Sequence, residues 1–252
     1  MITVNAMIKI LAIGNSFSTD ATAYVEPISE SIGKEIFVRN LFVGGCSLKM
    51  HAGYLLSKEM VYEYQRNGEY LRLISLPEAL EAEAWDHITL QQASHDSGLI
   101  ETYEPYLSIL ITAIKKACPK ATLHWHQTWA YEHDSDHPNF DNYERSQNKM
   151  FSAISDNSRI VCTRYGLSLI PVGSLIQHIR GLPPFNTRDG GVSLCRDGFH
   201  LSFTYGRFIA ALCWSYHFLG DIVSSSTFEP LSPDRDLMLL IASETRNHLS
   251  SL

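Results

Sequence analysis

Two short segments of the sequence carry side chains that together suit nucleophilic catalysis. Ser16 lies in the small polar segment GNSFS, at positions 14–18, directly after an apolar run. Asp197 and His200 lie far along the chain in the segment RDGFHLS, at positions 196–202. A serine hydroxyl needs a base within hydrogen-bond reach, and a carboxylate can hold a histidine in the tautomer that acts as that base. Each segment alone also fits a capped helix start, so only the pair predicts a catalytic triad.

Strands must carry these residues to one place. The apolar run at 7–13 is typical of a strand that is buried on both faces of a sheet. Shorter apolar segments predict further strands at 36–43, 87–91, 122–126 and 168–172.

Helical spacing of apolar residues fills the gaps between the strands, most regularly at 103–117, 201–219 and 234–249. This alternation predicts one domain over residues 1–252, with a three-layer α/β/α architecture and a doubly wound, mainly parallel, five-stranded sheet. Ligands of such sheets bind beyond the carboxyl ends of the strands, which is where Ser16 is expected to lie.

The GNSFS segment after the first strand and the DGFHLS segment before the last long helices resemble the blocks of the GDSL-like, or SGNH, hydrolase superfamily. The resemblance runs from about residue 10 to residue 219. It implies a flavodoxin-like fold and a serine esterase that needs no cofactor, with Ser16, Asp197 and His200 as its catalytic residues. The usual Gly-Asp-Ser has become Gly-Asn-Ser here, a change that leaves the nucleophile in place.

The same resemblance implies an oxyanion hole. The backbone N–H groups of Ser16 and Gly45 would supply two donors, Gly45 belonging to the Asn-led segment after the second strand. The family's third donor is an asparagine in a G-x-N-D block, but residues 90–95 read LQQASH and contain no asparagine. A branch with L-Q-Q in this place is the most similar. Gln92 is the preferred substitute, and Gln91 and His95 are the alternatives.

Aromatic residues follow the fourth predicted strand. Trp129 and Tyr131 are expected to line the substrate cleft, where they could stack on a sugar. Since relatives often deacetylate carbohydrates, the resemblance implies removal of acetyl or other short acyl groups from a carbohydrate or small-molecule ester.

Two other functions fit parts of the sequence. His124 and His126 share one face of a predicted strand and could ligate zinc in a metal-dependent hydrolase. No H-E-x-x-H pattern accompanies them, so no metal is predicted. The altered third block also fits a carbohydrate-binding protein that has kept the fold and lost activity. An α/β-hydrolase would need G-x-S-x-G, which the sequence lacks.

The composition disfavours some classes of binding partner. A net charge of −7 without a basic run disfavours nucleic acid, and no apolar stretch reaches the roughly 20 residues of a membrane span. Five scattered cysteines fit free thiols in a reducing compartment. Residues 1–6 lack the features of a secretory signal, so the default location is the cytoplasm, or outside the cell if a leader has been removed. No pattern in the sequence specifies an oligomeric state.

Overall fold

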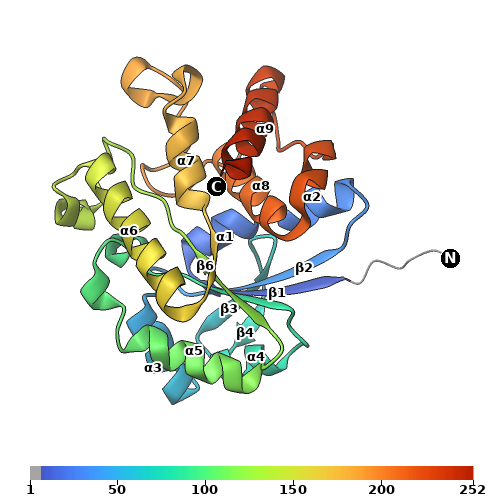
Figure 1. Cartoon of the computed structure of the whole chain (residues 1–252), viewed down its shortest axis with the longest axis vertical. Coiled ribbons are helices and arrows are strands. Elements are labelled where there is room, and N and C mark those ends of the chain that lie inside the picture. The colour runs from blue at the N-terminus through green and yellow to red at the C-terminus, as the bar shows by residue number, and fades with distance from the viewer. Residues whose placement is uncertain (1–6, 252) are drawn as a thin grey trace.

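Seven strands form one mixed sheet with helices on both faces in this computed structural model, which describes residues 7–251 (Figure 1). The strand order is β4-β3-β2-β1-β5-β6-β7. The strand bounds are β1 Ile8–Gly14, β2 Ile36–Phe42, β3 Tyr62–Arg66, β4 Glu69–Ile74, β5 His87–Leu90, β6 Thr122–His126 and β7 Ser168–Ile170.

The five predicted strands are β1, β2, β5, β6 and β7, and all their pairings are parallel. The α/β class is therefore confirmed, but the predicted number of strands was wrong. An antiparallel hairpin, β3–β4, extends the sheet beyond β2. Polar residues interrupt both of its strands, and β4 is an exposed edge, so they lack the apolar runs of the central strands. The Asn67-Gly68 turn, with both residues at positive φ, was the overlooked signal for this hairpin.

Strand β1 shows why its sequence is almost continuously apolar. Ile10 and Ala12 face one hydrophobic core, while Leu11 and Ile13 face the other. Strands β2 and β5 pair with β1 from opposite sides. The chain after β1 therefore emerges at the point where the strand order changes direction, which is the usual ligand site of doubly wound sheets.

Nine helices cover the sheet within residues 7–251. Their bounds are α1 Ser16–Thr22, α2 Val25–Ser31, α3 Leu48–Ser57, α4 Leu76–Glu81, α5 Tyr106–Ala117, α6 Gln147–Tyr165, α7 Val172–Arg180, α8 Gly206–Leu219 and α9 Arg235–Ser250. Helices α3, α4 and α5 pack on one face, and α1, α2, α7 and α8 pack on the other, with α9 outside α8 (Figure 1). The predicted helices at 103–117, 201–219 and 234–249 correspond to α5, α8 and α9.

None of the helices between residues 7 and 251 is long and apolar enough to cross a bilayer. The expectation that no leader is present concerns residues 1–6, which lie outside the described part of the chain.

Candidate active site

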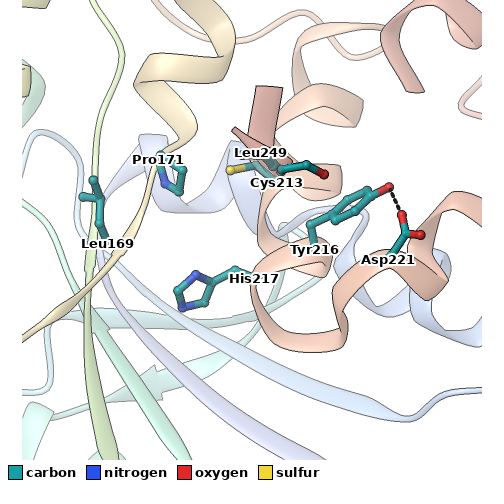
Figure 2. A pocket seen from close by; sticks show the side chains of 8 residues that line it. Leu169, Pro171, Cys213, Tyr216, His217, Asp221 and Leu249 are labelled. Carbon is teal, nitrogen blue, oxygen red and sulfur yellow. Dashed lines mark hydrogen bonds between the residues drawn. The ribbon is translucent and has the colours of Figure 1, made fainter. Parts of the chain in front are cut away.

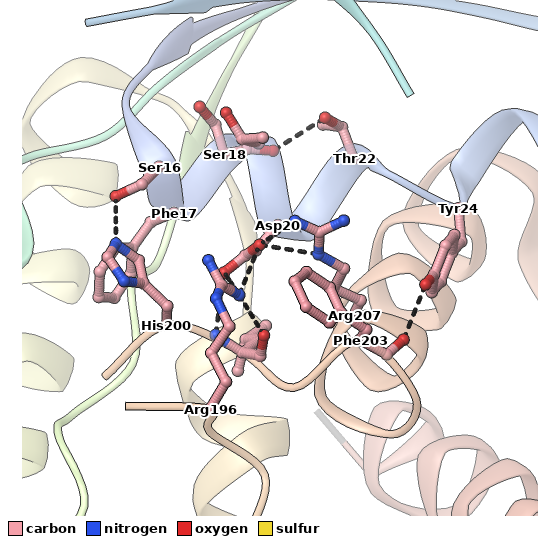
Figure 3. A network of polar contacts seen from close by, with 12 residues as sticks. Ser16, Phe17, Ser18, Asp20, Thr22, Tyr24, Arg196, His200, Phe203 and Arg207 are labelled. Carbon is pink, nitrogen blue, oxygen red and sulfur yellow. Dashed lines mark hydrogen bonds and ion pairs between the residues drawn. The ribbon is translucent and has the colours of Figure 1, made fainter. Parts of the chain in front are cut away.

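Ser16 is the first residue of α1, directly after the turn that follows β1. Its side chain approaches a loop from the opposite end of the sequence (Figure 3). The Ser16 Oγ lies 2.9 Å from His200 Nε2, and His200 Nδ1 lies 2.7 Å from Asp197 Oδ2. With a proton on Nδ1 bonded to Asp197, Nε2 is free to accept the proton of the Ser16 hydroxyl.

Asp197 is held by the backbone as well as by the imidazole. Its Oδ1 accepts the N–H of His200 at 2.7 Å and the N–H of Phe199 at 3.3 Å. Partial burial raises the pKa of Asp197, but the hydrogen bonds from the His200 ring, the His200 backbone and Phe199 outweigh it and keep the pKa below its usual value. Asp197 is therefore ionised at neutral pH and can orient a histidine base.

The loop that carries Asp197 and His200 is narrow and tightly held. Arg196 N donates to the carbonyl of His200 at 2.8 Å, which closes the loop on itself. Gly198 has a φ of +81°, and a Cβ there would lie 3.0 Å from the Cα of Ser135. Trp129 Nε1 donates to the carbonyl of Phe199 at 2.7 Å. The positive φ and the close approach of Ser135 together require glycine at position 198, and the Trp129 hydrogen bond holds the next residue in place.

Asp20 lies one turn after Ser16 in α1 and joins this helix to the loop of Asp197 and His200 (Figure 3). Its carboxylate is completely buried and accepts the N–H of Leu201, the residue after His200, at 2.9 Å. It also forms ion pairs with Arg196 at 2.9 Å and with Arg207 at 2.7 Å. No sequence pattern predicts this cluster, because Asp20 lies about 180 positions from both arginines; the one local signal is its spacing from Ser16.

Asn15, the residue before Ser16, ties three segments together. Its Oδ1 accepts the N–H of Phe17 at 3.0 Å and the Gln91 amide at 2.9 Å. Its Nδ2 donates to the carbonyl of Cys46 at 3.1 Å. An amide can accept and donate at the same time, whereas an ionised aspartate only accepts, so asparagine suits this position.

Gly45 lies in the turn that ends at Cys46 and lines the same cavity as Ser16. It has a φ of +62°, and an added Cβ would have no neighbour within 4 Å. Glycine is therefore favoured at this position by the backbone conformation and not by lack of space. Its N–H donates no hydrogen bond to any of residues 7–251, which leaves it available to a ligand.

The predicted third oxyanion donor does not reach this cavity. Gln92 is buried, and its Nε2 donates to Thr102 Oγ1 at 3.0 Å while its Oε1 accepts the N–H of Leu48 at 2.9 Å. The amide of Gln91 is occupied by Asn15. Among the three candidates only His95 lines the cavity. In this segment the side chains of Gln91 and Gln92 therefore point into the protein interior, and His95 borders the cavity.

Trp129 and Tyr131, expected in the substrate cleft, are both fully buried. The ring of Trp129 stacks on Phe17 with centroids 4.1 Å apart, and the Tyr131 hydroxyl lies 2.9 Å from Ser94 Oγ. Neither ring presents a face for a sugar. Both rings instead support the loop of residues 197–200: Trp129 Nε1 donates to the carbonyl of Phe199, and the Tyr131 ring lies 5.6 Å from the Phe199 ring.

The two histidines of β6, His124 and His126, are also buried and contact other side chains in the interior. His124 lies between two other imidazoles, with its Nε2 2.9 Å from His87 and its Nδ1 2.8 Å from His217. His126 Nδ1 lies 2.8 Å from the side-chain oxygen of Gln91. Burial lowers the pKa of both His124 and His126 to about 3. Within residues 7–251 no group of three or more His, Cys, Asp or Glu residues is arranged to hold a metal ion.

A cavity of about 550 Å³ opens over Ser16 and His200. It is bordered by the turn after β2, the hairpin strand β3 and the loop of residues 196–200. Its lining includes Phe42, Gly44, Glu63, Gln65, His137 and Phe199. A second cavity, of about 290 Å³, lies between α8, α9 and β7 (Figure 2). Its lining includes Pro171, Cys213 and His217, and no serine hydroxyl there pairs with a histidine. The contact between Ser16 and His200 thus lies in the first cavity.

Comparison with known proteins agrees with this architecture. A crystal structure of a DUF4886 family protein from Bacteroides uniformis is 32% identical, with 97% of this chain and 95% of that chain aligned at a TM-score of 0.89. A protein from Slackia heliotrinireducens, provisionally described as an SGNH hydrolase, is 23% identical over 83% of this chain and 98% of its own, with a TM-score of 0.55.

An acetylxylan esterase from Geobacillus stearothermophilus is 13% identical, covers 85% of this chain and 94% of its own, and gives a TM-score of 0.51. The fold is therefore the one found in SGNH hydrolases. No curated protein matches the sequence. The model of a domain of unknown function, DUF4886, matches residues 9–236. Together with the Bacteroides uniformis structure, this match shows that the chain belongs to the DUF4886 family.

Proposed function

We propose that this protein is a serine esterase that removes short acyl groups through an acyl-serine intermediate. The observation that carries the proposal is the continuous contact from Asp197 through His200 to the hydroxyl of Ser16, inside a cavity. The SGNH hydrolase fold of the chain supports it, because hydrolases are known on that fold.

The mechanism follows from the hydrogen bonds. His200 Nε2 takes the proton as Ser16 Oγ attacks the ester carbonyl, and Asp197 stabilises the imidazolium that forms. His200 then gives the proton to the departing alcohol oxygen, which leaves an acyl-Ser16. Water, deprotonated by His200, attacks this acyl group, and the carboxylic acid departs as Ser16 recovers its proton.

The oxyanion is proposed to bind the backbone N–H groups of Ser16 and Gly45. His95 takes the place first assigned to Gln92, since it is the residue of the third block that has a ring beside the cavity. Loss of one oxyanion donor typically costs about 10²–10³ in rate. His95→Ala should therefore lower kcat strongly, with little change in KM.

The substrate is proposed to be an acetyl or similarly short ester of a carbohydrate or small alcohol. The acetylxylan esterase among the structural neighbours favours this class. Burial of Trp129 and Tyr131 removes them from sugar recognition. Contacts with the alcohol part then fall to the cavity lining, in which Phe42 and Phe199 are partly exposed aromatic residues.

The test is hydrolysis of 4-nitrophenyl esters of increasing acyl length by the wild type and by Ser16→Ala. We expect turnover of the acetate, a decline with longer chains, and no turnover by Ser16→Ala. Ser18→Ala is the matched control, because the Ser18 hydroxyl is buried and donates to Asn40 at 2.6 Å. Equal activity in wild type and Ser16→Ala would refute the proposal, and wild-type inactivity with retained sugar binding would favour a binding protein.

A further inference from the structure

The cluster of Asp20, Arg196 and Arg207 beside the triad carries a net positive charge. Asp20 is one buried carboxylate, and both Arg196 and Arg207 form ion pairs with it. Two guanidinium groups against one carboxylate leave a formal charge of +1. All three residues line the cavity that holds Ser16.

Arg196 also has unused hydrogen-bond donors. Its contacts with Asp20 and with the carbonyl of Leu201 all use Nη1. Its Nε and Nη2 groups donate to no acceptor in the described part of the chain, and 30% of the side chain is exposed. The guanidinium carbon lies 4.9 Å from the ring centroid of Phe203, which helps to fix its orientation. A preorganised fork of this kind suits a carboxylate, sulfate or phosphate.

Within the lining of the Ser16 cavity no further acid pairs with this charge, although Arg196 also borders a neighbouring cavity that is lined by Asp134, Asp136 and Asp197. Glu63 is the other acidic residue in the lining, and its carboxylate accepts the amide of Gln65 at 3.0 Å. No ion pair joins Glu63 to either arginine within residues 7–251. An anionic ligand would therefore be attracted to the Arg196 side of the cavity and repelled from the Glu63 side.

The position of Arg196 indicates which part of the substrate it would meet. His200 must protonate the departing alcohol oxygen, so the alcohol part of the ester lies on the side of His200. Arg196 belongs to the same short loop and lies between His200 and Asp20 (Figure 3). The acyl group would lie on the other side of the carbonyl.

We propose that Arg196, reinforced by the charge of Arg207, forms an anion-binding subsite, so that the preferred substrates are short-chain esters whose alcohol part carries a negatively charged group. This inference rests on the proposed esterase function. Carboxylate, sulfonate and phosphate share the required chemistry, since each offers oxygen acceptors with a full negative charge.

The experiment compares two acetate esters that differ in one charge, 4-acetoxybenzoate and methyl 4-acetoxybenzoate. We expect Arg196→Gln to lower the ratio of their kcat/KM values, charged to neutral, by about tenfold, the size of one charge-assisted hydrogen bond. Comparing this ratio between variants cancels the intrinsic reactivity of the two esters. Arg207→Gln should lower it less, and high salt should lower it in the wild type.

Controls separate the subsite from general damage. Arg66 pairs with the buried Glu26 and lies outside the cavity lining, so Arg66→Gln should leave the ratio unchanged. Arg196→Lys keeps the charge and should recover part of the ratio. 4-Acetoxybenzenesulfonate tests whether any anion is accepted or only a carboxylate.

Binding to the Ser16→Ala protein, measured by calorimetry, gives a readout without turnover. About tenfold tighter binding of 4-acetoxybenzoate than of its methyl ester, lost in Ser16→Ala/Arg196→Gln, would support the subsite even if no ester were hydrolysed. Hydrolysis of both esters with the same ratio in wild type and Arg196→Gln, together with equal binding, would overturn the subsite and leave the esterase function standing.

Discussion

Asp20 and Glu26 are two buried carboxylates with nearly the same surroundings and different consequences. Each binds two arginines and one backbone N–H: Arg196, Arg207 and Leu201 for Asp20, and Arg39, Arg66 and Val38 for Glu26. The partners of Glu26 come from the neighbouring strands β2 and β3. Those of Asp20 come from the catalytic loop and α8, and they connect the helix of Ser16 to the residue after His200.

The same arrangement of charges therefore holds strands β2 and β3 against α2 at Glu26, whereas at Asp20 it holds the loop of His200 against the helix of Ser16. What differs is the segment that the carboxylate holds. Removal of either carboxylate should destabilise the protein, but only removal of Asp20 should move the base relative to the nucleophile.

The largest effect on kcat is expected from a substitution of His200. Asp20 can differ from Glu26 in its effect on catalysis only if the loop that it holds carries the base. His200→Gln should lower kcat by at least about 10³-fold, because Ser16 loses its proton acceptor. The measurement is 4-nitrophenyl acetate hydrolysis at neutral pH.

His124→Gln is the matched control for His200, because His124 bonds only to other imidazoles in the interior. It should lower the free energy of unfolding by about 1–3 kcal/mol and leave kcat within a few-fold. A larger loss of kcat in His124→Gln than in His200→Gln would place the base elsewhere.

The second effect concerns the carboxylates themselves. Asp20→Asn should lower kcat by about 10–10²-fold, because a small displacement of the loop carries His200 away from Ser16. Urea unfolding should show that Asp20→Asn and Glu26→Gln each lower the free energy of unfolding by about 3–5 kcal/mol, since each leaves two arginines without their carboxylate.

Glu26→Gln should nevertheless retain wild-type kcat. Equal kcat in the two variants would show that Asp20 has a purely structural role, as Glu26 does.

The smallest effect is a pH dependence of stability. Burial lowers the pKa of His51 and His126 to about 3. An unfolded histidine binds a proton below about pH 6.5, while these two stay neutral in the folded protein. The unfolded state then binds more protons, so stability is lost as the pH falls below about 6.5, by up to about 1.4 kcal/mol per pH unit for each group.

Urea unfolding at pH 7.5 and 5.5 tests this difference, and His126→Gln should reduce it. A free energy of unfolding that is the same at both pH values would contradict the burial of these rings.

The central strands and the contact of Ser16, Asp197 and His200 were predictable because their signals are local. Strand β1 is buried on both faces and must be apolar throughout, and Asp197 and His200 contact each other within one short loop. Ser16 is brought to them by its position after β1, at the edge where such sheets bind ligands.

The remaining features depend on contacts that no local pattern encodes. Whether Gln92 or His95 turns toward the cavity depends on Thr102 and Leu48, which occupy the Gln92 amide. Trp129 and Tyr131 follow β6 in irregular backbone, where side chains no longer alternate between two faces, so their burial could not be inferred. The edge hairpin lacked the apolar run by which strands were recognised.

The most direct test of the account is labelling by a fluorophosphonate, which reacts with serine hydroxyls that have been activated by a base. We predict that mass spectrometry of the labelled protein places the adduct on Ser16, that Ser18→Ala still reacts, and that Ser16→Ala and His200→Gln do not. Failure of the folded wild-type protein to react, or an adduct on another residue, would contradict the assignment of Ser16 as an activated nucleophile.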